Sequence, residues 1–177
     1  MAFNTIEQKS FKILKDLNIA KAENIEIDKI AESLGIDVKG EELDDDISGL
    51  FVMKNGKPFI RFNNSEGQKR RRFTIAHELG HYVLHREGTP LFVDKKNEKT
   101  LYRNSTSSSG EVKREREANA FAASLLMPEA FISDEMRNIP LGKNPITHLA
   151  NVFNVSEQAM SFRLSNLGYD FNYYDDL

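Results

Sequence analysis

The chain has 177 residues, of which 40% are hydrophobic and 29% are charged; these proportions are typical of one folded domain and exclude wholesale disorder. The formal net charge of -3 argues against nucleic acid as the main partner, because phosphate contacts need clustered basic side chains. Cysteine is absent, which excludes disulfides and thiolate metal sites, and no apolar run is long enough for a signal peptide or a membrane span. We therefore expect a cytoplasmic protein in which any metal is held by His, Asp or Glu.

The first part of the chain predicts two short helices and a strand. Apolar residues recur at helical spacing from Ile6 to Leu17 and from Ile27 to Leu34. Gly35 stands where a left-handed residue would end the second of these helices. The segment from Ile36 to Val38 then indicates a short strand.

A β-hairpin is predicted next, directly before the longest helix. Leu50–Met53 and Phe59–Phe62 are apolar stretches joined by Asn55-Gly56, the residue pair typical of a tight hairpin turn. Residues Asn63 to Ser65 offer N-terminal caps for a helix from about Glu66 to Arg86. We therefore expect a small antiparallel sheet beside a long helix.

The second half of the sequence predicts further helices around one irregular segment. Gly88 to Gly110 loses helical periodicity and is rich in serine, which indicates a mobile loop acting as a flap or insertion. A helix from Glu111 to Met127 follows and is ended by Pro128. Two shorter helices are predicted from Ile146 to Phe153 and from Ser156 to Leu167.

A metal-binding motif lies in the middle of the long helix. His77-Glu78-Leu79-Gly80-His81 fits H-E-x-x-H, a spacing that places both imidazoles on one helical face within reach of one ion. Glu78 lies about 100° round the helix from His77, where its carboxylate can take a proton from water as a general base. Zinc suits this site, because it accepts three protein ligands plus water. The competing interpretation is a chance pattern containing two core or surface histidines.

A third ligand is expected from a later helix. A glycine inside a helix costs about 1 kcal/mol relative to alanine, so Gly80 indicates that another segment packs closely there. No histidine stands six residues after His81, which excludes the metzincin pattern. Glu115 shares a helical face with Ala118 and Ala122, small residues that allow such an approach. We therefore predict that Glu115 is the third ligand.

Other polar residues near the motif receive supporting or structural roles. Asn119, one turn beyond the predicted ligand, is expected to hydrogen-bond a histidine ring nitrogen as an outer-shell partner; the alternative is a surface amide. Glu117 points roughly 160° away by helical geometry, so we expect it to meet solvent or to pair with Lys113 or Arg116, and we keep it as the reserve ligand. His85 is interpreted as a helix-end histidine favoured by the helix dipole, and Lys69–Arg72 as a solvated face.

Two segments carry a resemblance to a known family. Residues 72–81 read RFTIAHELGH, and residues 115–128 read EREANAFAASLLMP. With these motifs most of the chain resembles the ImmA/IrrE-type zinc metallopeptidases, which are gluzincin-like enzymes. The resemblance implies Zn²⁺ on His77, His81 and Glu115, with Glu78 as the general base.

The expected fold class is α+β. We expect a single domain over residues 1–177: a mainly helical zincin-like metallopeptidase core with a small antiparallel β-sheet over residues 1–145, and a C-terminal helical element over residues 146–177. The resemblance further implies a cytoplasmic endopeptidase of bacteria or phages. Its substrate would be a helix-turn-helix repressor or an antitoxin, in the control of mobile elements or stress responses.

Two other functions compete with proteolysis. Residues 146–167 echo a helix-turn-helix, but Arg163 is the only arginine or lysine among them, whereas a recognition helix needs several donors for phosphates and bases. A metal-bound interaction module or toxin–antitoxin component could instead inactivate its repressor partner without cutting it. The intact Glu78 favours hydrolysis, while the substrate's identity and the oligomeric state stay open.

Overall fold

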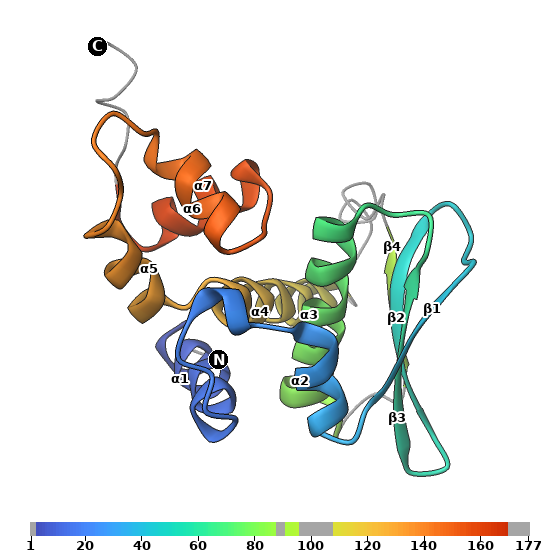
Figure 1. Cartoon of the computed structure of the whole chain (residues 1–177). Coiled ribbons are helices and arrows are strands. Elements are labelled where there is room, and N and C mark those ends of the chain that lie inside the picture. The colour runs from blue at the N-terminus through green and yellow to red at the C-terminus, as the bar shows by residue number, and fades with distance from the viewer. Residues whose placement is uncertain (1–2, 88–90, 96–107, 170–177) are drawn as a thin grey trace.

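The computed structural model describes residues 3–87, 91–95 and 108–169, which form an α+β fold of seven α-helices, one 3-10 helix and a four-stranded sheet (Figure 1). In chain order the elements are α1 (Phe3–Asp16), η1 (Ala22–Asn24), α2 (Ile27–Ser33), β1 (Asp37–Glu41), β2 (Ile47–Lys54), β3 (Lys57–Asn63), α3 (Gln68–His85), β4 (Leu91–Lys95), α4 (Ser108–Leu126), α5 (Glu129–Met136), α6 (Pro145–Val152) and α7 (Glu157–Asn166). The predicted fold class is confirmed. Among these described elements, none of the helices combines the length and the apolar character that crossing a bilayer requires.

The predicted hairpin is confirmed and forms the centre of the sheet. Asn55 and Gly56 have φ values of 53° and 75°, and a two-residue turn of type I′ requires positive φ at both positions. β2 and β3 pair antiparallel along their length, with Phe51 opposite Ile60. Both of these side chains are fully buried, so the hairpin contributes one apolar face to the core.

The sheet is mixed rather than purely antiparallel, and it contains a strand that was not predicted. The strand order is β1-β3-β2-β4, with β1 parallel to β3 and β4 antiparallel to β2. β4 lies inside the predicted flap, where its short apolar run is too brief to be told from a loop by periodicity. Residues 88–90 and 96–107 of that segment lie outside the described residues, so the flap stays a prediction.

Asn63 joins the sheet to α3 in a different way from the predicted one. α3 has Gly67 as its N-cap residue and no side-chain cap. The buried Asn63 amide instead donates to two carbonyl oxygens of the loop between β1 and β2 and to the carbonyl oxygen of Ile47 at the start of β2, at 3.0 to 3.3 Å. Its oxygen accepts from the Ser65 N–H at 3.0 Å. These bonds fix the loops at the sheet end from which α3 departs.

α3 is the central helix of the fold. Figure 1 shows it between the sheet and the remaining helices, with α4 running across it. A Cβ atom added at Gly80 would lie 3.1 Å from both the Cα and the carbonyl oxygen of Ala118, and 3.2 Å from the ring of Phe121. The close approach predicted at Gly80 is therefore confirmed, because a Cβ atom there would lie closer to the backbone of α4 than most Cβ contacts in proteins allow.

The C-terminal helices follow the prediction with one addition. α4 ends before Pro128, as expected, but Pro128 also precedes α5, which was not predicted. α6 and α7 match the two short helices expected there. The side chains of Asn144 and Ser156 cap their N-termini by accepting from backbone N–H groups at 3.1 Å.

A buried arginine ties the last helix to the first. Arg163 of α7 is 3% exposed, and its Nε donates to the Met127 carbonyl at 2.9 Å. One terminal nitrogen of the same guanidinium lies 2.7 Å from both carboxylate oxygens of Glu7 in α1. The only arginine or lysine of the α6–α7 pair is thus inside the protein, which removes it from any contact with DNA.

We predict that Arg163→Met lowers the free energy of unfolding by about 3 kcal/mol, because it leaves the Glu7 carboxylate without its partner in a partly buried position. Arg137→Met is the matched control, since Arg137 pairs with Asp134 where both side chains are mostly exposed. That variant should change stability by about 0.5 kcal/mol or less. Urea denaturation of both proteins checks this; equal losses in the two would contradict a structural role specific to Arg163.

Candidate metal centre

The H-E-x-x-H residues lie in the buried middle of α3. His77, Glu78 and His81 are 3%, 0% and 1% exposed, respectively. They are buried because the sheet covers one side of α3 and α4 covers another (Figure 1). Polar side chains at such depth are costly unless they bind something, so their burial requires partners within the site.

Glu115 of α4 reaches both histidines. Its Oε2 lies 3.1 Å from the Nε2 atom of His77, and its Oε1 lies 3.1 Å from the Nε2 atom of His81. The two Nε2 atoms are also 3.1 Å apart. The structure therefore brings the three sequence-predicted ligands together, and the close contact of α4 with Gly80 is what allows it.

Asn119 fixes the orientation of the His77 ring. The Oδ1 atom of Asn119 lies 3.0 Å from Nδ1 of His77. An amide oxygen only accepts, so the His77 Nδ1–H donates and the neutral ring carries a lone pair on Nε2. The position of Asn119 agrees with the outer-shell contact expected from the sequence.

His81 is oriented by a pair of residues that sequence reasoning placed elsewhere. Nε2 of His85 lies 2.9 Å from Oε2 of Glu117, and Nδ1 of His85 lies 3.3 Å from Nδ1 of His81. A carboxylate accepts, so a neutral His85 donates from Nε2 and accepts from the His81 Nδ1–H. His81 then also presents a bare Nε2.

His85 does end α3, as expected, but the expectation that Glu117 meets solvent or pairs with Lys113 or Arg116 was wrong, because Glu117 contacts His85. Their side chains are only 7% and 12% exposed, so His85 is not a plain helix-end residue and Glu117 does not face solvent. Helical-wheel angles describe where a side chain leaves the axis and ignore how far two long side chains reach. The available signal was the spacing, because His85 continues the i, i+4 row of His77 and His81 along α3.

The protonation states of His81 and Glu115 follow from their burial and from their contact with each other. Burial lowers the pKa of His81 from 6.5 to about 4, although the neighbouring carboxylate of Glu115 acts to raise it. Burial by itself would raise the pKa of Glu115, but its close contacts with the His77 and His81 rings lower it to about 2. Near neutral pH the site therefore holds a neutral His81 and an ionised Glu115.

This donor set fits a divalent metal ion. Two lone-pair nitrogens and a carboxylate converge at about 3 Å, and three acceptors so close repel one another unless a cation lies between them. Tetrahedral zinc with bonds of about 2.0 to 2.1 Å separates its ligand atoms by roughly 3.3 Å. Three protein ligands also leave a fourth position open, which is the pattern of catalytic rather than structural zinc sites.

Glu78 lies on the side of α3 that faces the sheet. A Cβ atom added at Gly49 of β2 would lie 3.6 Å from Oε1 of Glu78 and 2.3 Å from Cγ2 of Thr74. The missing side chain at Gly49 therefore makes room for Thr74 of α3, and the Glu78 carboxylate lies at an ordinary contact distance from the same position. Glu78 does not belong to the group of three ligand atoms, as expected for a residue with a different task.

The basic run before the motif is only partly a solvated face. Lys69 and Arg70 are exposed, as predicted. Arg72 is half-buried and donates to the carbonyl oxygen of Ile25 at 3.0 Å, which links α3 to the start of α2. Burial lowers the pKa of Arg72, so this contact is structural rather than a site for an anion.

We predict that the wild-type protein binds one zinc ion and that three substitutions reduce its affinity for zinc to different extents. Glu115→Ala removes a ligand and should abolish stoichiometric zinc. Glu117→Ala removes only the group that orients His85 and should weaken affinity about 10- to 100-fold. Glu111→Ala, on the exposed first turn of α4, is the control and should match the wild type. Elemental analysis and competition with a chromophoric chelator measure the order; zinc retained by Glu115→Ala would overturn the ligand assignment.

We predict that the metal-free protein loses stability between pH 6.5 and 4. In that window the unfolded chain protonates His81 at its ordinary pKa of 6.5, whereas the folded chain resists protonation down to about 4. The free energy of unfolding therefore falls as the pH falls, by up to about 3 kcal/mol. Urea denaturation in chelator at pH 7 and 4.5 measures the change, and His81→Asn should flatten it. An undiminished slope in that variant would assign the effect to other groups.

Comparison with known proteins agrees with this geometry. The chain is 33% identical over 106 residues to an uncharacterized immunity region protein 2 of Bacillus phage phi105, a match covering 59% of this chain and 60% of that protein. A solved structure described as a Mycobacterium tuberculosis transcriptional regulator shares the fold, with a TM-score of 0.65 and 19% identity, over 92% of this chain and 46% of that one. The chain thus spans less than two thirds of either relative. Residues 31–165 match the IrrE N-terminal-like domain of peptidase family M78. Because this match covers most of the chain, the chain belongs to this family.

Proposed function

We propose that the protein is a zinc metalloendopeptidase that hydrolyses a peptide bond in a regulatory protein. The observation that carries this proposal is the convergence of His77, His81 and Glu115 on one point, with the buried carboxylate of Glu78 on the same helix. Membership of the peptidase M78 family supports it. The substrate class is inferred to be a helix-turn-helix repressor or an antitoxin.

Different residues of the site have different roles in the proposed hydrolysis. His77, His81 and Glu115 would hold zinc, which supplies a Lewis acid for the scissile carbonyl and makes water more acidic when bound. Glu78 takes the proton from the attacking water and passes it to the nitrogen of the leaving amine as the C–N bond breaks. Asn119 and His85 keep both imidazoles in the tautomer that leaves Nε2 bare.

The proposal of a regulatory substrate rests on the sequence resemblance and on the descriptions of two similar proteins. The phage relative is described as an immunity region protein, and the structural neighbour as a transcriptional regulator. These descriptions belong to those proteins. For this chain they favour a role in switching a repressor, and the buried Arg163 argues against the alternative of direct DNA binding.

We predict that Glu78→Gln keeps stoichiometric zinc and lowers the rate of substrate cleavage about 100-fold or more, because it removes the proton acceptor and retains the side-chain shape. The assay co-expresses each variant with a repressor encoded beside the protein and reads cut sites by intact-mass spectrometry. Glu87→Gln, at an exposed position just after α3, is the control and should cut at the wild-type rate.

Two other results would redirect the proposal. Equal cutting by wild type and Glu78→Gln would remove Glu78 from the reaction. Loss of repressor activity without any cut, in both proteins, would instead identify a metal-bound module that inactivates its partner by binding.

A further inference from the structure

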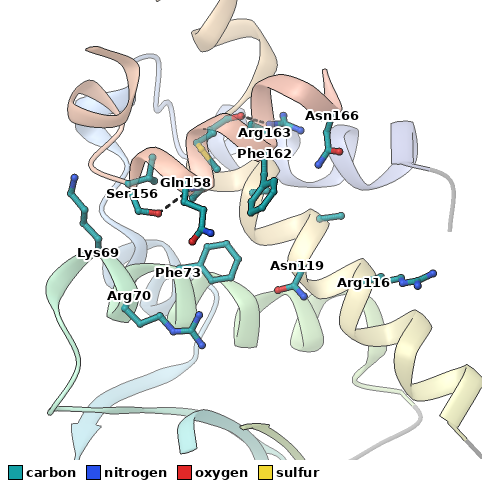
Figure 2. Close-up of a pocket in the computed structure, with 15 residues that line it drawn as sticks. Lys69, Arg70, Phe73, Arg116, Asn119, Ser156, Gln158, Phe162, Arg163 and Asn166 are labelled. Atoms are coloured by element: carbon teal, nitrogen blue, oxygen red, sulfur yellow. Dashed lines mark hydrogen bonds between the residues drawn. The ribbon is translucent and has the colours of Figure 1, made fainter. Parts of the chain in front are cut away.

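A groove of about 730 Å³ lies between α3, α4 and α7 (Figure 2). Its walls are largely apolar and include Phe73 of α3, Ala123 of α4 and Phe162 of α7. Figure 2 shows the two phenylalanine rings pointing into the groove from facing helices. Phe162 is 64% exposed, and an aromatic ring left open beside an apolar groove is typical of a surface that binds another protein.

The rim of the groove is positively charged. Lys69 and Arg70 lie at one end and Arg116 at the other, whereas none of the described residues that line the groove is acidic (Figure 2). Arg70 also contacts Glu66 at 3.5 Å, so Lys69 and Arg116 contribute most of the available charge. Arg163 is paired inside the core and contributes little. A basic rim on a chain of net charge -3 selects a ligand of opposite sign.

The groove is adjacent to the metal centre. Asn119 lines it, and the Oδ1 atom of the same residue accepts the hydrogen bond from Nδ1 of His77. The same imidazole ring presents its Nε2 atom to Glu115. A segment bound in the groove would therefore be separated from the position proposed for the metal by the side chains of Asn119 and His77.

All three walls of the groove are helices, and this determines the conformation of an occupant. Helical walls have their backbone groups paired internally, so an extended peptide would find no strand edge to pair with there. A helical segment satisfies its own backbone and needs only side-chain contacts. A small anion would meet the basic rim but leave the apolar floor and Phe162 uncovered.

From these observations, and resting on the proposed peptidase function, we infer that the groove between α3, α4 and α7 is a docking site for an acidic amphipathic helix of the protein substrate. Apolar side chains on one face of that helix fill the floor between Phe73 and Phe162. Its Glu and Asp residues pair with Lys69 and Arg116. Docking there holds the substrate beside the metal centre and raises the local concentration of the scissile bond.

The test measures binding separately from cleavage. The probes are two fluorescent peptides of about 16 residues, roughly four helical turns, with the same Leu and Phe face and with either Glu or Lys on the polar face. The protein is the full chain carrying Glu78→Gln, so a failure of the proposed hydrolysis does not affect the readout. We expect the Glu peptide to bind with an affinity that falls as salt rises, and the Lys peptide to bind at least tenfold more weakly.

Variants of the groove locate the contact. Phe162→Ser should weaken the Glu peptide about tenfold, as should Lys69→Glu combined with Arg116→Glu. Lys143→Glu, at an exposed position outside the groove, is the control and should bind like the parent. Zinc content is measured in each variant, because Arg116 neighbours the ligand Glu115.

Three results would overturn the inference. The first is equal binding of both peptides, and the second is binding that neither set of groove substitutions changes. The third is binding that appears only after residues 170–177 are removed, which would assign the groove to the acidic and aromatic C-terminal segment of the chain itself.

Discussion

The contact between Gly80 of α3 and Ala118 of α4 sets the geometry of the whole site. Two helix backbones approach there so closely that a methyl group could enter only if α4 moved by a few tenths of an ångström. Because Glu115 lies one turn before Ala118, this approach is what carries its carboxylate to 3.1 Å from both histidines. The glycine sacrifices about 1 kcal/mol of helix propensity. In exchange for this cost, a second helix places a carboxylate beside the two histidines, which no residue spacing within α3 could do.

Much of this arrangement could be predicted from the sequence because it depends on patterns within a few neighbouring residues. H-E-x-x-H fixes two ligands by helical spacing alone, Gly80 marks the contact, and the small residues beside Glu115 identify the face that answers it. The hairpin was equally local, since Asn55-Gly56 specifies its turn. Each of these predictions needed only a few neighbouring residues.

The features that were missed depend on tertiary partners. β4 is a strand because β2 offers it an edge, and five residues carry too weak a periodicity to show this in advance. The sheet is mixed because β1 pairs parallel to β3, on the side of β3 away from β2. His85 and Glu117 meet only because α4 crosses α3, so their pairing is invisible on either helix alone.

The bond between Glu7 and Arg163 joins residues 156 positions apart, whereas His77 and Asn119, which also contact each other, are only 42 positions apart. Contacts across long separations form late, because the loop they close costs more conformational entropy. During synthesis the helices that carry the metal ligands can therefore pair before α7 has emerged, while α1 still lacks its charged partner. We therefore expect the chemical centre to assemble from the middle of the chain before α1 and α7 join through Glu7 and Arg163.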